Sequence, residues 1–499
     1  MEDTPLPNVP GSTAQIPTEA LEELKDLLGH DEWKTDARTR REHEHDSWVL
    51  SIKNRPLGDQ YETMPAGVAR PKTTEQVSRL LAWASRHGIP IVPYGAGSGV
   101  MGGTVPTKGG ISLDLGAFDE IEELDAENLL VTVGAGLYGG AFEEKLEAQG
   151  FTVGHYPQSL HISTVGGWVA TRGSGTFSSL YGNIEDMVVG LEVVLPTGEV
   201  IHTKTVPRSA SGPDYKQLFI GSEGTLGVIT RVTLRMWPRP EVRAFRALSF
   251  ASFKDGLETI RGVVQGGVRP AVVRLYDPVE GRPTLEHFGH DSNRWLLVIA
   301  FDGNRRMVEL EESITVETAL GFGAEDLGRE PAEHWERHRF EIAWLWERVN
   351  LSGGIAEAIE VAHVWSRLEE TYERMVEAVR PHMPDVFGHV SHVYPQGASL
   401  YVICRALEAD DEAAECAYQD GWRAAMRACL QTGATISHHH GIGLQRAPWM
   451  QAEHGMGLDA LRRIKRALDP AGIMNPGKLG LDPEPHDEPG TRQTTIGEE

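Results

Sequence analysis

The stretch PYGAGSGVMGGT, residues 93–104, contains five glycines and follows directly on the apolar run HGIPIVPY. Glycine lacks a Cβ, so the backbone amides of such a loop can turn inward and approach a phosphate closely. The loop lacks the Lys-Ser or Lys-Thr pair of a Walker loop and the clean GxGxxG spacing of a dinucleotide fold. It predicts a phosphate-binding loop of another kind, although a glycine-rich turn after a strand is more often only a turn.

Two further loops favour the binding interpretation. STVGGWVATRGSG (residues 163–175) and IGSEGTLGVIT (residues 220–230) are also rich in Gly, Ser and Thr, and both lie beside strand-like runs. Three such loops in one stretch predict a long ligand that is held at several points.

Composition and charge narrow the class of protein. The chain has 499 residues, enough for two or three domains of about 150 residues each. Its formal net charge of -25 repels nucleic acid and anionic membranes, and no long Lys/Arg-rich run offsets it. The three cysteines, Cys404, Cys416 and Cys429, form no CxxC pair, which argues against a disulfide framework and a thiolate zinc site. We expect buried thiols and no nucleic-acid partner.

The location follows from what the sequence lacks. No apolar run approaches the roughly 20 residues that span a bilayer. The first residues have no apolar signal-peptide core, and the last have no SKL ending. We expect a cytoplasmic protein.

Alternating strand and helix patterns predict the domain organisation. A tail and a helical segment, with Thr18 as the helix cap, occupy residues 1–63. An α+β domain follows over residues 64–239 and ends where WPRPE breaks the pattern. Within it, VARPKTTEQVSRLLAWASRHGIPIVPY predicts a strand, a Thr-capped helix and a strand, and MVVGLEVVLPTGEVIHT predicts a hairpin about the turn at residues 196–198. Strand-helix-strand units then predict a second domain, residues 240–431, with an antiparallel sheet and helices on one face. Residues 432–480 return to the active site, and residues 481–499 form a disordered tail by composition.

These loops resemble those of the flavoproteins of the vanillyl-alcohol oxidase type, and within them most closely those of the alkyldihydroxyacetonephosphate synthases. The resemblance spans residues 64–479 and is carried, in order, by STVGGWVATRGSG, YGNIEDMVV, IGSEGTLGVIT and SHHHGIG. It implies an α+β fold in which a two-subdomain FAD-binding domain is joined to a cap domain made of an antiparallel sheet plus helices.

The resemblance also implies an FAD gripped by main-chain amides of four loops, as small side chains permit. The implied contact residues are Pro93, Tyr94, Gly95, Ala96, Gly97, Ser98, Gly99, Gln158, Ser159, Leu160, His161, Ile162, Ser163, Thr164, Thr171, Arg172, Gly173, Ser174, Glu223, Gly224, Thr225, Leu226, Gly227, Val228 and Ile229. In some relatives a histidine of the first loop bonds covalently to the flavin. Residues 93–104 contain no histidine, so we expect non-covalent FAD.

Six residues fall on the family's catalytic positions. By resemblance Tyr394 is the tyrosine that exchanges a proton with the substrate carbon beside the carbonyl. The family's essential histidine triplet falls on His438, His439 and His440, and an arginine needed for activity falls on Arg274. Across an alignment gap, the arginine that holds the departing carboxylate falls on Arg348.

The tyrosine, the histidines and Arg274 each have a plainer interpretation. A tyrosine in a strand is more often part of the core or its rim. Histidine-rich runs can bind metal, although three consecutive residues rarely point at one ion. Arg274 can simply pair with Asp277 on the surface, at little energetic gain.

The resemblance leaves two reactions to compare. In the first, the acyl group of acyl-dihydroxyacetone phosphate is exchanged for a fatty alcohol through a flavin N5 adduct, with Tyr394 as the acid-base group. In the second, a related family of FAD-dependent D-2-hydroxyacid dehydrogenases shares the ending LDPxxIMNPGK, here residues 468–478. Those enzymes hold a divalent metal with two histidines and a glutamate. Here two of those three positions read Tyr401 and His439, which favours the synthase and predicts no metal.

The expected substrate is a small molecule or lipid. A peripheral membrane contact and a homodimer stay open, because the sequence has no basic amphipathic helix that would decide the former. A flavin-free binding protein would require the three glycine-rich loops to be empty.

Overall fold

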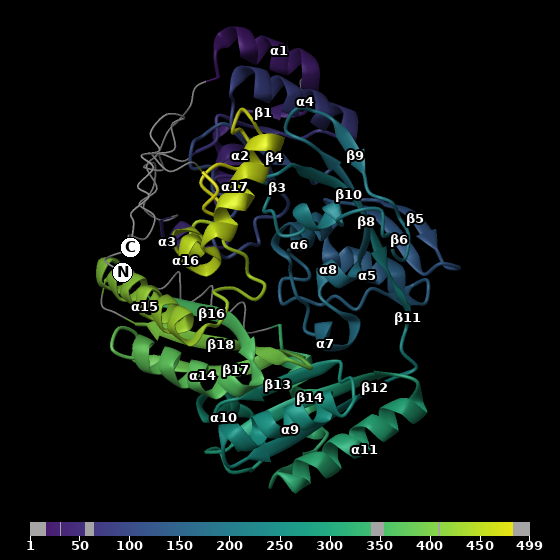
Figure 1. Cartoon of the computed structure of the whole chain (residues 1–499), viewed down its shortest axis with the longest axis vertical. Helices are drawn as coiled ribbons and strands as arrows, with labels where there is room; N and C mark the ends of the chain where they lie inside the picture. The colour runs from purple at the N-terminus through teal and green to yellow at the C-terminus, as the bar shows by residue number, and fades with distance from the viewer. Residues whose placement is uncertain (1–15, 30, 55–63, 341–353, 408–409, 483–499) are drawn as a thin grey trace, which may run out of the picture.

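A computed structural model describes residues 16–29, 31–54, 64–340, 354–407 and 410–482. Figure 1 shows two parts joined along one side, with the first two sheets in one part and the large third sheet in the other. Arg348 and the ends of the chain, including nearly all of the predicted disordered tail, lie outside the described residues. Among the described helices, none combines the length and the apolar character that crossing a membrane requires.

The first sheet carries the glycine-rich loop at the end of a strand. Its order is β1-β2-β4-β3, with β2, β4 and β3 parallel to one another. Its strands are β1 (Trp33–Lys34), β2 (Gly67–Ala69), β4 (Ile111–Asp114) and β3 (Ile91–Tyr94), and the neighbouring helices are α1 (Thr18–Leu28), α2 (Ala37–Glu42), α3 (Val49–Asn54) and α4 (Thr74–His87).

Helix ends show one cap that was predicted correctly and one that was not. The Thr73 side chain accepts a hydrogen bond from the backbone N–H of Gln76 at 3.2 Å and so caps α4, as the pattern predicts. Thr18 is not a cap, because it is the first helical residue of α1 and Pro17 occupies the cap position. Proline has no side-chain acceptor, so this end lacks a side-chain cap.

The second sheet is antiparallel and has the order β5-β6-β10-β8-β9. The hairpin predicted about residues 196–198 is present, with Val194 opposite Val200. The strands are β5 (Ile121–Asp125), β6 (Leu130–Gly134), β10 (Val228–Arg235), β8 (Val188–Val194) and β9 (Val200–His202), and a small pair is formed by β7 (Phe151–Thr152) and β11 (Trp237–Pro238). The helices here are α5 (Gly139–Glu147), α6 (Val165–Thr171), α7 (Ser178–Tyr181), α8 (Ile184–Met187) and the 3-10 turn η2 (Tyr215–Leu218).

The third sheet forms the cap, and all of its strand pairs are antiparallel, as predicted. Its order is β15-β12-β14-β13-β17-β18-β16. The strands are β15 (Glu325–Gly328), β12 (Val242–Phe250), β14 (Trp295–Gly303), β13 (Val272–Tyr276), β17 (Asp385–Tyr394), β18 (Gly397–Ala406) and β16 (Ile355–Val364).

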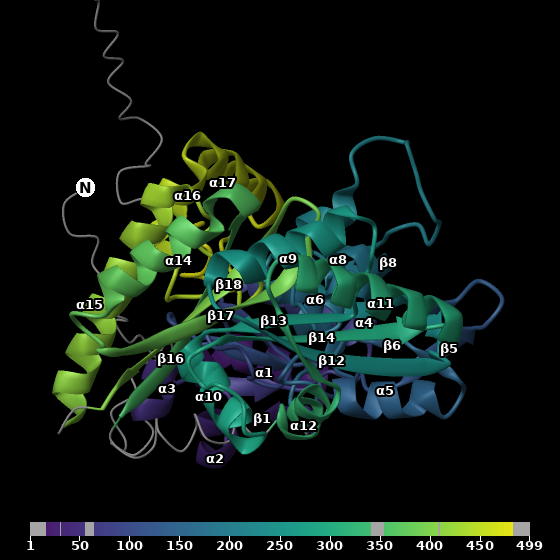
Figure 2. The ribbon, with the colours of Figure 1, turned by 90° about the horizontal axis from the view of Figure 1, so that it is seen from below.

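Helices cover both faces of the cap sheet, whereas the sequence predicts one face. Four long helices pack on one face: α9 (Phe253–Gln265), α11 (Arg305–Gly321), α14 (Trp365–Val379) and α15 (Asp411–Thr432). Two shorter ones, α10 (Pro278–His287) and α12 (Glu330–His338), pack on the other face (Figure 2). Central strand β14 explains why, since Leu297 and Ile299 join one core and Leu296 and Val298 the other. A strand that is apolar on both faces must be covered on both.

The C-terminal segment leaves the cap and returns to the first sheet. It contains η3 (Ala447–Trp449), α16 (Met450–His454) and α17 (Met456–Leu468). Ile91 of β3 then donates to the carbonyl of Ile473 and accepts from the N–H of Asn475, both at 2.8 Å. The buried ammonium of Lys478 donates to the carbonyl of Val105 at 2.7 Å. The NPGK ending therefore holds the chain against the strand that leads into the glycine-rich loop.

Candidate active site

The structure brings the four predicted cofactor loops into contact. A Cβ added at Gly95 would lie 2.4 Å from Thr164 Oγ1, so the first two loops touch. A Cβ at Gly224 would lie 2.7 Å from Pro93 Cγ, so the fourth loop touches the first. The N–H of Glu223 donates to the carbonyl of Ala170, just before the third loop, at 2.9 Å.

The first loop requires glycine at position 97. Gly97 has a φ of +64°, which L residues rarely adopt, and a Cβ there would lie 2.2 Å from Tyr94 Oη. The buried Oε1 atom of Gln158, at the start of the second loop, has no hydrogen-bond partner among the described residues. Such an orphan acceptor fits a polar ligand held between these loops.

Some of the predicted contact residues face outward. His161 and Ile162 are exposed, and His161 packs edge-on against Phe340. Arg172 is also exposed and pairs with Glu185 at 2.9 Å. Their backbones lie in the loops, but these side chains turn to the surface. Most of the other predicted contact residues are buried or half-buried.

Tyr394 lies where the cap meets these loops. It is the last residue of β17, and its Oη is 2.7 Å from His438 Nε2. The side-chain amide of Asn183 donates to the same oxygen at 2.9 Å. Ser174, in the third predicted cofactor loop, donates to Asn183 Oδ1 at 2.8 Å. Burial raises the pKa of the Tyr394 phenol well above its usual range, so it is neutral at pH 7.

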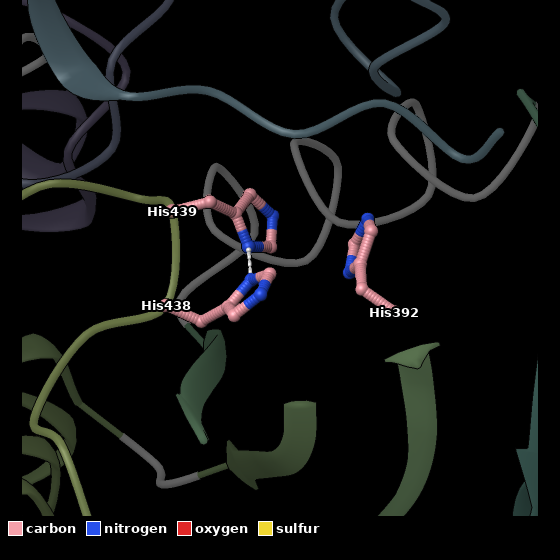
Figure 3. Close-up of side chains that lie close together, drawn as sticks. All are labelled: His392, His438 and His439. Carbon is pink, nitrogen blue, oxygen red and sulfur yellow. Dashed lines mark hydrogen bonds between the residues drawn. The ribbon is translucent and has the colours of Figure 1, made fainter. Parts of the chain in front are cut away.

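The histidine triplet divides into a pair and a single residue. His438 Nδ1 and His439 Nδ1 are 2.8 Å apart (Figure 3). His439 Nε2 is 2.8 Å from Tyr401 Oη. His440 faces another way, toward the buried carboxylate of Glu360 at 3.7 Å. Burial lowers the pKa of all three imidazoles, to about 4 for His440, so the rings are neutral at pH 7.

A buried ion pair holds the triplet in place. Glu360 on β16 accepts from the backbone N–H groups of His438 and His440, and Arg446 donates to the same carboxylate at 2.8 Å. Both side chains of the ion pair are fully buried. Burial alone would raise the pKa of Glu360, but the charge of Arg446 and the neighbouring donors hold it at about 2. The loop is therefore fixed by a carboxylate that stays ionised.

Comparison with known proteins assigns the family. The model "FAD binding domain" matches residues 65–204, and "FAD linked oxidases, C-terminal domain" matches residues 239–479. An FAD-linked oxidoreductase of Escherichia coli, YgcU, is 33% identical over 92% of this chain and 97% of its own. The chain belongs to the FAD-linked oxidoreductase family. Its cofactor is FAD, as predicted.

Other relatives differ in their named activities. An alkyldihydroxyacetonephosphate synthase of Caenorhabditis elegans is 32% identical and covers 90% of this chain and 81% of its own. Glycolate oxidase subunit GlcD of Bacillus subtilis is 29% identical and covers 84% and 90%. A solved alkyldihydroxyacetonephosphate synthase superposes with a TM-score of 0.78 at 24% identity, covering 95% of this chain and 88% of that one. The predicted fold class is confirmed. The relatives have different named activities, so they do not decide between the two reactions for this oxidoreductase.

Arg274 of this oxidoreductase is a buried cation and not a surface partner of Asp277. Its guanidinium is 3.0 Å from His389 Nε2, and His389 in turn contacts Glu280 at 2.8 Å and stacks on Tyr401. Asp277 instead caps α10 by accepting from two backbone N–H groups. The Nε atom of Arg274 is buried and has no partner among the described residues.

Several residues of the site were not predicted from the sequence: Asn183, Glu360, His389, His392 and Arg446. The sequence did contain a signal for His392. It lies two residues before Tyr394, and because side chains alternate along a strand, the two side chains are expected on the same face. His389 joins the same group only because of a register shift between Val390 and Val393.

Proposed function

We propose that this oxidoreductase carries out the alkyldihydroxyacetonephosphate synthase reaction, in which a fatty alcohol replaces the acyl group of acyl-dihydroxyacetone phosphate. The observation that carries the proposal is the hydrogen bond between Tyr394 Oη and His438 Nε2 at the junction of cap and cofactor loops. A phenol paired with a neutral imidazole can pass a proton in either direction. Proton transfer at the substrate carbon beside the carbonyl is what this exchange requires of the protein.

Each residue of the site has a defined task in this proposal. Tyr394 gives its hydroxyl proton to His438 Nε2 and takes the substrate proton in its place, and both transfers reverse when the proton is returned to the substrate carbon. Asn183 fixes the phenol oxygen through its amide. The FAD, held by the glycine-rich loops, supplies the reactive centre to which the substrate carbon is presented.

Arg274 is suited to bind the anionic end of the substrate. Its buried Nε–H is unpaired among the described residues, and an unpaired buried donor favours an acceptor that arrives with the ligand. A phosphate or a leaving carboxylate has the matching charge. An anionic group of this kind is part of acyl-dihydroxyacetone phosphate, so the proposed substrate is still a lipid or other small molecule.

A second candidate is the oxidation of a D-2-hydroxyacid. Its support is the shared ending at residues 468–478 and the similarity to the glycolate oxidase subunit. A buried arginine also suits the carboxylate of a hydroxyacid. At two of that family's three metal-ligand positions, however, Tyr401 and His439 are hydrogen-bonded to each other at 2.8 Å.

One pair of assays separates the two candidates. In the first, the purified FAD-loaded protein is incubated with acyl-dihydroxyacetone phosphate and a long-chain alcohol, and the ether product and the released fatty acid are quantified by mass spectrometry. In the second, D-lactate and glycolate are added without oxygen, and flavin absorbance is followed. Ether formation without flavin reduction by the hydroxyacids supports the synthase. Flavin reduction that an electron acceptor reverses, with no ether product, establishes the hydroxyacid enzyme instead.

A further inference from the structure

The outward face of helix α11 carries a row of apolar side chains. Its inward face packs on the cap through the buried residues Val308, Glu312, Thr315 and Ala319. On the opposite face, Met307, Leu310 and Ile314 are 55%, 54% and 39% exposed. Their spacing of three and four residues places them side by side along one helix face. Single exposed apolar residues are common on soluble proteins, whereas a contiguous row of them marks a surface that contacts another molecule.

This row is accessible in the folded protein. Helix α11 lies on the outside of the cap, at the end of the molecule opposite α1 (Figure 1). Within the cap it contacts α9, β12 and β14, which leaves the row facing outward. The exposed fractions show that no described part of the chain covers it. Another molecule can therefore reach the row without any rearrangement of the fold.

Opposite charges flank the row on the same helix face. Arg306 directly precedes Met307, and Glu317 lies three residues after Ile314. Both charged side chains are exposed, and neither has a partner among the described residues. A helix rises 1.5 Å per residue, so the two charges are roughly 16 Å apart along its axis. The face is therefore positive at one end, apolar in the middle and negative at the other end.

Such a face is complementary to itself. When a second copy is turned so that the two helices run antiparallel, the positive end of each helix lies against the negative end of the other. We propose that α11 joins two copies of this chain in this way, about a two-fold axis that passes between Leu310 and Ile314. Leu310 then packs on the partner's Ile314, and Arg306 lies beside the partner's Glu317. The symmetry repeats each contact, so two ion pairs enclose an apolar centre.

The charge of the chain favours a second copy over a membrane as the occupant of this face. The chain has a net charge of -25, and Glu317 lies on the same face as the row, so anionic lipid headgroups would be repelled. A single helix pair buries less than the roughly 800 Å² per partner of a standard interface. The dimer is therefore weak and forms reversibly as the protein concentration rises. It does not depend on which reaction the active site catalyses.

The first test measures the mass of the full-length, FAD-loaded protein by sedimentation equilibrium over a range of concentrations. The mass of wild type should rise from that of one chain, 54.8 kDa, toward twice that value. Leu310→Glu should stay at the mass of one chain, because dimerisation would bury its carboxylate in the apolar centre. The matched control is Leu407→Glu, which places the same charge at an exposed leucine outside α11 and should associate as wild type does.

A second test exchanges the charges and so examines the antiparallel arrangement itself. Arg306→Glu and Glu317→Arg each set like charges against each other at both ends of the helix pair. Each variant alone should therefore dimerise about fivefold more weakly than wild type, or weaker still. An equimolar mixture of the two variants restores opposite charges at both ends and should associate more strongly than either variant alone.

Three results would overturn the proposal. They are a one-chain mass for wild type at every concentration, dimerisation of Leu310→Glu equal to that of wild type, and a mixture of the charge variants that associates no better than its components. A one-chain mass together with binding to phosphatidylcholine vesicles would assign the row to a lipid surface instead. Flavin content and melting temperature show that each variant is folded, which is expected because the substituted side chains are exposed.

Discussion

Tyr394 reaches the site because β17 ends at this residue and the chain turns back at Pro395 and Gln396 into β18. A tyrosine inside the strand would be confined to the core or to one sheet face. At the end of the hairpin, the ring projects past the sheet toward Asn183, which belongs to the FAD-binding part. The Tyr394 phenol is thus linked through Asn183 to Ser174 of the third predicted cofactor loop.

The first prediction concerns Tyr394→Phe. The substitution keeps the ring and its packing but removes the oxygen that exchanges the proton with His438. General acid-base catalysis contributes about 10²- to 10⁴-fold, so kcat/KM for ether formation should fall on that scale. Flavin content should be unchanged, since Asn183 lies between this phenol and the loops.

Tyr215→Phe serves as the control for this prediction. Tyr215 is an exposed tyrosine outside the site whose hydroxyl donates to the carbonyl of His202. Its loss should leave turnover unaltered. Full activity in Tyr394→Phe would remove the tyrosine from the proposed mechanism.

The second prediction concerns the pH dependence of stability. Glu357 is buried on β16, and its carboxyl group accepts from the hydroxyl of Tyr418 at 3.0 Å. Burial raises its pKa from 4.5 to about 7. Between these values the folded chain binds more protons than the unfolded chain, so the free energy of unfolding falls as pH rises. The slope from one such group is at most about 1.4 kcal/mol per pH unit.

Glu357→Gln imitates the protonated form and should flatten this dependence between about pH 5 and pH 7. Urea unfolding of wild type and variant at both pH values measures the difference. Glu373→Gln, which changes an exposed carboxylate on α14, should keep the wild-type slope. Parallel pH profiles for wild type and Glu357→Gln would show that Glu357 does not hold its proton in the folded state.

At the scale of elements, the loop after β3 joins the strand to the cofactor site, and its geometry gives the third prediction. Gly97→Val places a β-branched side chain at a φ of +64° and a Cβ within 2.2 Å of Tyr94 Oη. The loop must move, so FAD should be lost during gel filtration, as the ratio of flavin to protein absorbance reports. Gly88→Val is the matched control, with a φ of +63° and no atom within 4 Å of the added Cβ. It carries similar strain and should retain FAD; equal loss in both would trace the effect to general instability.

Elements with a clear period or cap were predictable, and those set by long-range packing were not. The Thr73 cap, the hairpin about residues 196–198 and the antiparallel cap each follow from local sequence. The Thr18 cap was wrong because Pro17 took the cap position. Glu360 alternates with buried Ile359 and would be assigned to a solvent-facing side, yet the segment at Thr435 pairs with β16 and covers it.

The same limit applies to the histidine cluster. His438 and His439 could be identified because they are adjacent in a recognisable motif. The motif says nothing of how the two rings turn, nor that His440 faces Glu360. The His392 ring, whose centroid is 5.0 Å from that of His438 and 4.9 Å from that of His439, comes from strand β17, and only the fold brings it near.

At the scale of the whole molecule, the cofactor site is assembled from segments far apart in the chain. Glu223, in the fourth loop, accepts from the N–H groups of Ile442 and Gly443 at 2.6 and 2.8 Å. Asn475 donates to the carbonyl of Glu223 at 2.6 Å. The FAD-binding part, the histidine loop and the C-terminal segment are therefore fixed to one another at this residue.

The last prediction follows from this assembly. The first loop contains no histidine to bond to the flavin, so FAD should be held by these contacts alone. Acid precipitation should release all the flavin into the supernatant and leave a colourless, non-fluorescent pellet. Because the ligand binds segments that only the folded chain brings together, the melting temperature of the stripped protein should rise with added FAD in proportion to the logarithm of its concentration. Flavin fluorescence that stays with the denatured chain would mean a covalent link from another residue, and a melting temperature indifferent to FAD would mean that the loops do not form its site.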